Sequence, residues 1–184
     1  MTIPIDELGA ENERLMLLVL DLAKHQHEDH PNGAAAAAFV FGAKMDLTVV
    51  ALAGIPNWGE PGRLGTEAIE ILRGICAEKR AYFVAIISDA WVKRITDDEA
   101  FRESGLDPSR VNDWLPVDQD RFVVRREALV VSIETHDGYK LLRQFYRRQG
   151  PRIVWEELEN GSLVPAGLGG RMLDLLPPRR KTGS

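Results

Sequence analysis

Cysteine is almost absent from this chain of 184 residues. Cys76 is the single cysteine, so no disulfide can form within the chain and no cage of several thiolates can hold a metal ion. Long apolar runs are also missing, because the longest, residues 34–43, is too short to span a bilayer. We therefore expect a soluble protein of the cytoplasm, with no membrane partner.

An excess of basic charge is lacking as well. Lys and Arg number 23 against 28 Asp and Glu, for a formal net charge of −5, which gives no overall attraction to nucleic acid. The acidic start, "MTIPIDELGAENE", lacks the features of a secretory signal. Apolar residues make up 45% of the chain, enough to build one core. We predict a single domain over residues 1–176 and a flexible basic tail over residues 177–184.

The first half of the chain alternates helical and strand-like patterns. Apolar residues at helical spacing predict a helix over residues 6–24, which "HPNG" then ends. Two runs rich in Val, Phe and Leu predict a β-hairpin within residues 34–54. A second helix is expected from Thr66 to about Arg80, with Cys76 on its apolar stripe.

The second half predicts a central strand and an antiparallel run. Residues 81–91, "AYFVAIISDAW", are apolar on both alternating faces, as in a strand covered on both sides. Residues 95–126 have no sustained period and are expected to form a long excursion with a short helix near residues 108–114. Three further strands, joined in part by an Asp-Gly turn, and a last helix are predicted at residues 127–135, 139–148, 152–158 and 171–176.

The element order α-β-β-α-β-β-β-β-α predicts an α/β protein of the α+β type. Its sheet should be largely antiparallel, with five to six strands and helices packed on it. Roadblock-like and profilin-like modules have a similar order, a likeness of fold that carries no function. The run from "HPNGAAAAAFVF" to "AYFVAIISDAWV" and "REALVVSIET", residues 31–135, resembles a family of bacterial and phage-borne proteins whose apolar strand ends in Asp-Ala-Trp. That resemblance implies no activity.

Three of the four histidines lie in one short string. His25, His27, Asp29 and His30 form H-x-H-x-D-H, which resembles the first metal-binding signature of the metallo-β-lactamase superfamily and implies a metal-activated hydroxide. The superfamily places this string after a strand and needs more histidines downstream, whereas here it follows a helix and only His136 remains. We expect the histidines to splay, exposed and metal-free, around a frayed helix end.

No complete catalytic constellation is found elsewhere. Cys76 reads as a small core residue, and Ser88 and Asp89 adjoin on a strand and so face opposite sides. A carboxylate at Asp89, near the end of a buried strand, needs a partner, for which Arg143 or Arg147 is the natural choice. We predict no catalytic residue and no cofactor.

Two further stretches are candidates for binding. The loop "GIPNWGEPGRLGT" leads into a helix N-terminus, where Arg63 could meet an anion and Trp58 a ligand or partner, or Trp58 could simply fold onto the core. The basic strand 139–148 carries Arg143 and Arg147 on one face with aromatic residues, as single-stranded nucleic-acid binders do. Alternating arginines also protect exposed sheet edges.

The leading hypothesis is a non-catalytic interaction or regulatory module that self-associates, most simply as a two-fold dimer. Its partner would be protein, and nucleic acid is disfavoured by the charge. A metal-dependent hydrolase built on the histidine string and a nucleic-acid binder built on strand 139–148 are the alternatives. The residues expected at the interaction surface are Trp58, Arg63, Arg143, Arg147 and, on the last expected strand, Trp155.

Overall fold

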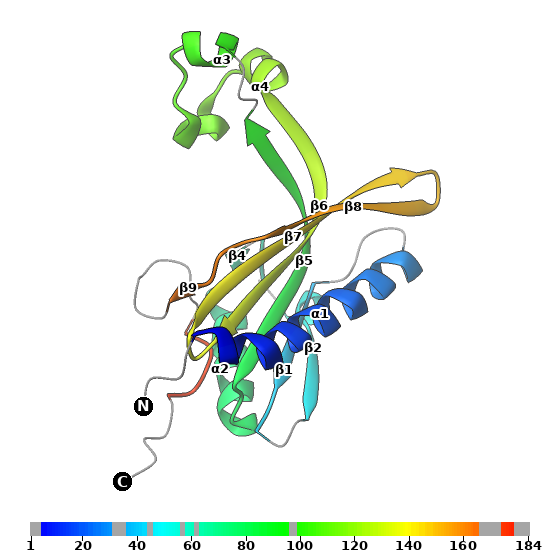
Figure 1. The fold of residues 1–184 in the computed structure, drawn as a ribbon, viewed down its shortest axis with the longest axis vertical. Helices are drawn as coiled ribbons and strands as arrows, with labels where there is room; N and C mark the ends of the chain where they lie inside the picture. Colours follow the sequence, from blue (N-terminus) through cyan, green and yellow to red (C-terminus); the bar gives the residue numbers. More distant parts are fainter. Residues whose placement is uncertain are drawn as a thin grey trace.

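The computed structural model describes residues 5–30, 36–43, 46–55, 58–60, 63–95, 99–165 and 174–178. Figure 1 shows its helices and strands along the chain. In order, they are α1 (Ile5–Asp29), β1 (Ala37–Phe41), β2 (Leu47–Ala51), η1 (Leu52–Gly54), β3 (Gly59–Glu60), β4 (Arg63–Leu64), α2 (Thr66–Lys79), β5 (Phe83–Ile95), α3 (Glu99–Glu103), η2 (Pro108–Asp113), α4 (Pro116–Phe122), β6 (Val123–Thr135), β7 (Gly138–Gln149), β8 (Arg152–Asn160) and β9 (Val164–Pro165).

One antiparallel sheet organises the chain. Its strands follow the order β2-β1-β5-β6-β7-β8, and β9 pairs with the first two residues of β7. The predicted α+β class, the early hairpin and the Asp-Gly hairpin between β6 and β7 are confirmed. The expected central strand is β5, which lies inside the sheet between β1 and β6.

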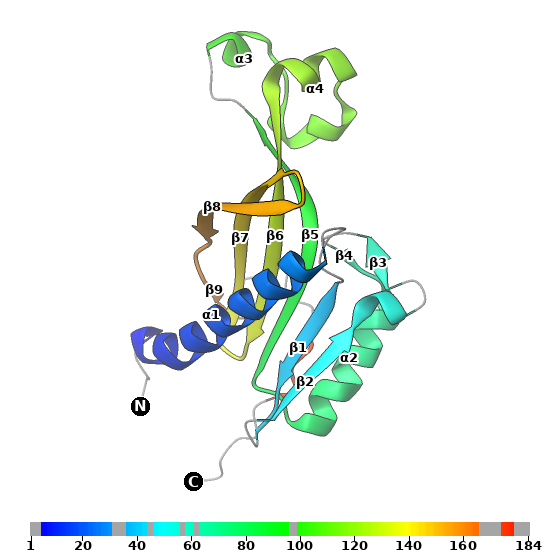
Figure 2. The ribbon, with the colours of Figure 1, turned by 90° about the vertical axis from the view of Figure 1, so that its right-hand side faces the viewer.

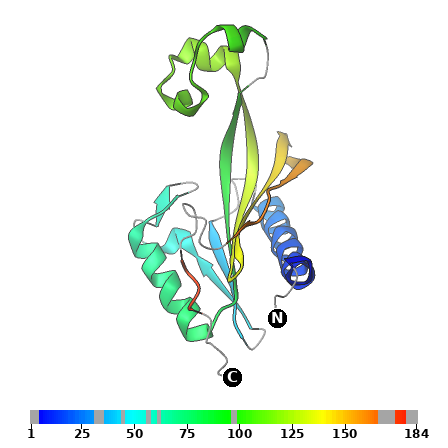
Figure 3. The same ribbon diagram turned by 60° about the vertical axis from the view of Figure 1, so that its left-hand side comes forward.

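The two long helices cover opposite faces of the sheet (Figure 3). Successive side chains of a strand point to opposite faces, so Phe83 and Ile87 pack with α1 while Val84 packs with α2. Five apolar residues of β5 and β6 are nearly fully buried, at 3% exposure or less: Phe83, Ile87, Leu129, Val131 and Ile133. All five pack with α1 and not with α2.

α1 continues five residues beyond its expected end, through the histidine string to Asp29. The buried stripe of the helix explains the extension, because Val19, Ala23 and His27 recur four residues apart and each is fully buried. α2 begins at Thr66 as expected, although Gly65 is its N-cap and no side chain caps it.

β5 and β6 leave the body of the sheet together. They pair over thirteen positions, from Phe83 opposite Thr135 to Ile95 opposite Val123, but β7 stops pairing with β6 at Glu127. Beyond this point the two strands form a ribbon that carries α3, η2 and α4 at its far end, as Figures 1 and 2 show. We call residues 91–127 the arm.

The arm corrects the expected excursion. Both strands run into it, and η2 confirms the short helix near residues 108–114, while α3 and α4 were not predicted. The helices form a small aromatic core, in which the Phe101 ring lies 5.7 Å from Trp114 and 5.6 Å from Phe122. The indole of Trp114 donates a hydrogen bond of 3.0 Å to the carbonyl oxygen of Asp107.

The last expected helix is not found where it is described. Residues 174–178 are not helical, and residues 171–173 and the tail from residue 179 lie outside the described residues. Leu175 is instead buried against the α2 side of the core, and its backbone N–H donates to Glu134 Oε1 at 2.7 Å. The buried carboxylate of Glu134 thus anchors this non-helical segment to β6.

No helix within the described ranges is long and apolar enough to cross a membrane.

Truncating Ile87 to Ala should lower the free energy of unfolding by about 2–5 kcal/mol, because it opens a cavity between β5 and α1. Val49, on β2 and 55% exposed, is the matched control, and its change to Ala should cost less than about 0.5 kcal/mol. Urea unfolding of both variants measures the difference, and equal losses would contradict the assigned faces.

Candidate interaction site on the arm

His27 lies in a buried polar junction at the base of the arm. Its ring is fully buried, and its Nδ1 lies 3.3 Å from Asp89 Oδ2 on β5. The hydroxyl of Tyr146, on β7, donates to the other oxygen of Asp89 at 3.3 Å. Asp89 therefore joins the end of α1 to two strands, and the expectation that all three histidines are exposed was wrong for His27.

Aromatic rings complete the junction. Tyr146 meets the His27 ring edge-on with centroids 4.6 Å apart, and Trp155 on β8 lies 5.8 Å away. The indole of Trp155 donates to Glu28 Oε1 at 2.6 Å, and the Lys24 ammonium sits 5.1 Å above its ring. Trp155 thus packs within the chain and joins α1 to β8. The interface role predicted for it stays a prediction.

Burial lowers the pKa of His27, because the apolar surroundings disfavour the imidazolium. The carboxylate of Asp89 opposes this shift and Arg148 adds to it. Burial also raises the pKa of Tyr146. The junction is therefore held at neutral pH by hydrogen bonds and ring contacts around a neutral imidazole.

The histidine string does not converge on a metal. His25 points to solvent, where its Nδ1 donates to the carbonyl oxygen of Asp21 at 2.9 Å, while His27 is buried on the other side of the same helix. Asp29 and His30 are exposed. Across the described ranges no group of three His, Cys, Asp or Glu side chains could hold a metal ion. That these residues bind none stays a prediction.

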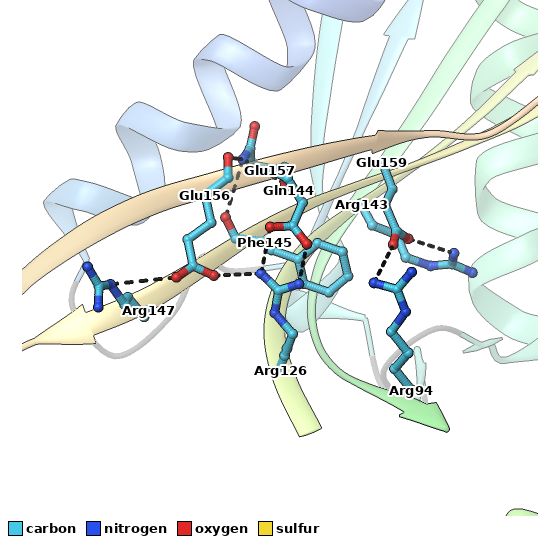
Figure 4. Close-up of polar contacts among 9 residues, drawn as sticks. All are labelled: Arg94, Arg126, Arg143, Gln144, Phe145, Arg147, Glu156, Glu157 and Glu159. Carbon is cyan, nitrogen blue, oxygen red and sulfur yellow. Dashed lines mark hydrogen bonds and ion pairs between the residues drawn. The ribbon is translucent and has the colours of Figure 1, made fainter. Parts of the chain in front are cut away.

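A ladder of ion pairs crosses β6, β7 and β8 on the face of the sheet that points away from α1 (Figure 4). Arg126 lies 4.1 Å above the Phe145 ring and donates to both Glu156, at 2.6 Å, and Glu157. The hydrogen bonds from Arg126 lower the pKa of Glu157 to about 2. Simple alternation would place these two neighbours on opposite faces, but the register shifts beside Phe145 and brings both to Arg126.

The predicted basic surface belongs to this ladder. Arg143 pairs with Glu159 at 3.4 Å and Arg147 with Glu156 at 3.5 Å. Neither reaches Asp89, so the partner expected for that carboxylate was wrong. Phe145 is buried in place of standing free for base stacking. Carboxylates thus neutralise the arginines on which the nucleic-acid interpretation rested.

The remaining candidates lie near α2. Trp58 is half-buried and packs against the core beside α2. The side chain of Arg63 lies outside the described residues. Cys76 is fully buried, which confirms it as a core residue, and burial raises the pKa of its thiol to about 12.

The arm exposes large apolar side chains that sequence reasoning did not single out. Trp91 on β5 is 67% exposed, Leu115 66% and Val117 68%. Trp91 shares a ribbon face with the exposed cations Lys93 and Arg125, since β5 and β6 pair in register there. The only sequence signal for this exposed surface was Trp91, which stands two residues after Asp89 near the end of an apolar run.

No protein-family model matches the chain, and no curated protein or solved structure matches it.

The pH dependence of stability should report on His27. Unfolded, His27 takes up a proton near pH 6.5, but the folded protein resists protonation because the pKa is lowered. The free energy of unfolding should therefore fall as the pH drops below about 6.5, until the lowered pKa is reached. Urea unfolding at several pH values should show that the free energy of unfolding falls less steeply with decreasing pH in His27→Gln than in the wild type.

His25→Gln is the control for this experiment. The pKa of His25 is raised, chiefly by its hydrogen bond to the Asp21 backbone, so its protonation stabilises the fold and its removal should not flatten the fall. The same slope in wild type and His27→Gln would contradict the account of the junction.

Arg126→Met should loosen β8, because it leaves Glu156 and Glu157 side by side without their shared cation. We expect amide hydrogen exchange over residues 152–160 to quicken several-fold. Arg147→Met removes one longer contact of a side chain that is 62% exposed and should change the exchange little. Equal effects of both changes would contradict the central place of Arg126 in the ladder.

Proposed function

We propose that the protein is a non-catalytic interaction module that self-associates, and that the arm is its contact element. One observation carries the proposal: Trp91, Leu115 and Val117 are each about two-thirds exposed on a projecting element. Scattered surface leucines are ordinary in soluble proteins, but a bare tryptophan on an isolated ribbon is typical of an interface anchor.

The shape of the arm supports the same conclusion. A two-stranded ribbon is only marginally stable by itself, yet β5 and β6 keep their register to its end. The aromatic core around Trp114 and the hydrogen bond from Lys93 Nζ to Asn112 Oδ1, at 2.9 Å, stiffen the far end. A stiff projection costs little entropy on binding, which suits an element that presents a surface to another protein.

The alternatives have less support in the described residues. The hydrolase would need His25, His27 and Asp29 around one ion, and they point in different directions on α1. The nucleic-acid binder would need free arginines on β7, and Arg143 and Arg147 are paired with glutamates.

Photo-crosslinking from the intact chain tests the proposal. A photoreactive residue placed at Leu115 or Val117 should yield one discrete adduct in cells that make the protein. Glu70, exposed on α2, is the control position and should yield none. The adduct mass tells a second copy from another protein. Absence of a discrete adduct from both arm positions, or an equal adduct from position 70, would contradict the proposal.

A further inference from the structure

The ribbon face of the arm combines an aromatic anchor with positive charge. Trp91, Lys93 and Arg125 lie on this face, and all three are exposed. The Arg125 guanidinium donates to Gln119 Oε1 at 3.3 Å, and Lys93 donates to Asn112. Within the described part of the chain these hydrogen-bond partners are neutral amides, which orient the cations but do not compensate their charge. The ribbon face is therefore suited to a surface that is both apolar and acidic.

α1 presents such a surface. Leu18 and Leu22, 45% and 39% exposed, stand one turn apart on its outer side. Exposed carboxylates flank them along the helix, at Glu11, Asp21 and Asp29. These three outnumber the exposed basic side chains of the same face, Arg14 and His25. We call these leucines and carboxylates the α1 stripe.

Both surfaces face the same side of the molecule. Ile87, Asp89 and Trp91 are spaced two residues apart on β5 and so point to the same face of the strand. Because Ile87 packs with α1, the ribbon face lies on the side of the sheet that α1 covers. The end of α1 lies at the base of the arm, where His27 meets Asp89. One chain therefore carries two complementary patches, offset along a single face.

We propose that the ribbon face of one copy packs on the α1 stripe of a second copy in a two-fold dimer. The inference rests on the proposed function and names its partner and surfaces. A two-fold axis makes each contact occur twice, so that Trp91 of each chain meets Leu18 and Leu22 of the other. Opposite charge along the two patches fixes their alignment.

Variants of each patch test the proposal by sedimentation. Wild type should sediment as a dimer, and Trp91→Ala should weaken the dimer at least about tenfold, as the loss of a central tryptophan does. Leu18→Ser with Leu22→Ser should weaken it similarly. Val49→Ala, at an exposed apolar site on β2, should leave it unchanged.

Mixing the two weakened proteins gives a sharper result. Trp91→Ala retains its α1 stripe and the double serine variant retains its ribbon face, so a mixed pair regains one of the two contacts. The mixture should associate more tightly than either variant alone, which two misfolded proteins could not do.

Several outcomes would overturn the inference. A wild-type protein that stays monomeric at the highest concentration at which it remains soluble would exclude the dimer. A crosslink from Leu115 to a different protein would in that case still support the proposed interaction function. A dimer that survives both sets of changes would place the contact elsewhere. Single-stranded DNA that binds the monomeric wild type but not Trp91→Ala would make nucleic acid the ligand of the ribbon face.

Discussion

The pairing of β5 with β6 is the constraint on which the rest of the structure depends. The two strands keep one antiparallel register over all thirteen residues of β5. Around Ile87 and Val131 the pair is covered by helices or neighbouring strands and forms the centre of the core. Around Lys93 and Arg125 the same pair stands in solvent. One continuous pair of strands thus builds both the body and the arm.

The junction of His27 and Asp89 marks the boundary between these two environments. Ile87 is wholly buried, Asp89 is 26% exposed at its side chain, and Trp91 is 67% exposed. A carboxylate at this boundary needs a partner, and the neutral imidazole and the Tyr146 hydroxyl supply it without bringing a second full charge into the core. The end of α1 is thereby fixed beside the base of the arm, which sets the position of the α1 stripe relative to the ribbon face.

The parts of the fold that sequence patterns predicted are those with one-sided or continuous burial. Residues 81–88 and 128–135 are mostly apolar and lie in the core, and Cys76 follows the stripe of α2. The ribbon escaped prediction because solvent on both its faces removes any apolar alternation. The helices beyond it are short, and their aromatic contacts join Phe101 to Trp114 and Phe122 across loops.

The candidate site was harder to predict for a different reason. His27 read as part of a local metal signature, whereas its actual partners, Asp89 and Tyr146, come from distant strands. Pairing such residues requires the sheet order, which no local pattern contains. The register shift of β8 beside Phe145 likewise brings Glu156 and Glu157 to one arginine, although simple alternation would place them on opposite faces.

Thiol trapping tests the packing of the ribbon face on the α1 stripe most directly. Cys76 is buried with a raised thiol pKa, so cysteines introduced at Trp91 of one chain and Leu22 of another would be the reactive pair. Under mild oxidation the mixed chains should form a disulfide-linked heterodimer, whereas a pair with its cysteines at Trp91 and at Glu70 on α2 should not. Equal trapping of both pairs, or of neither, would contradict the account.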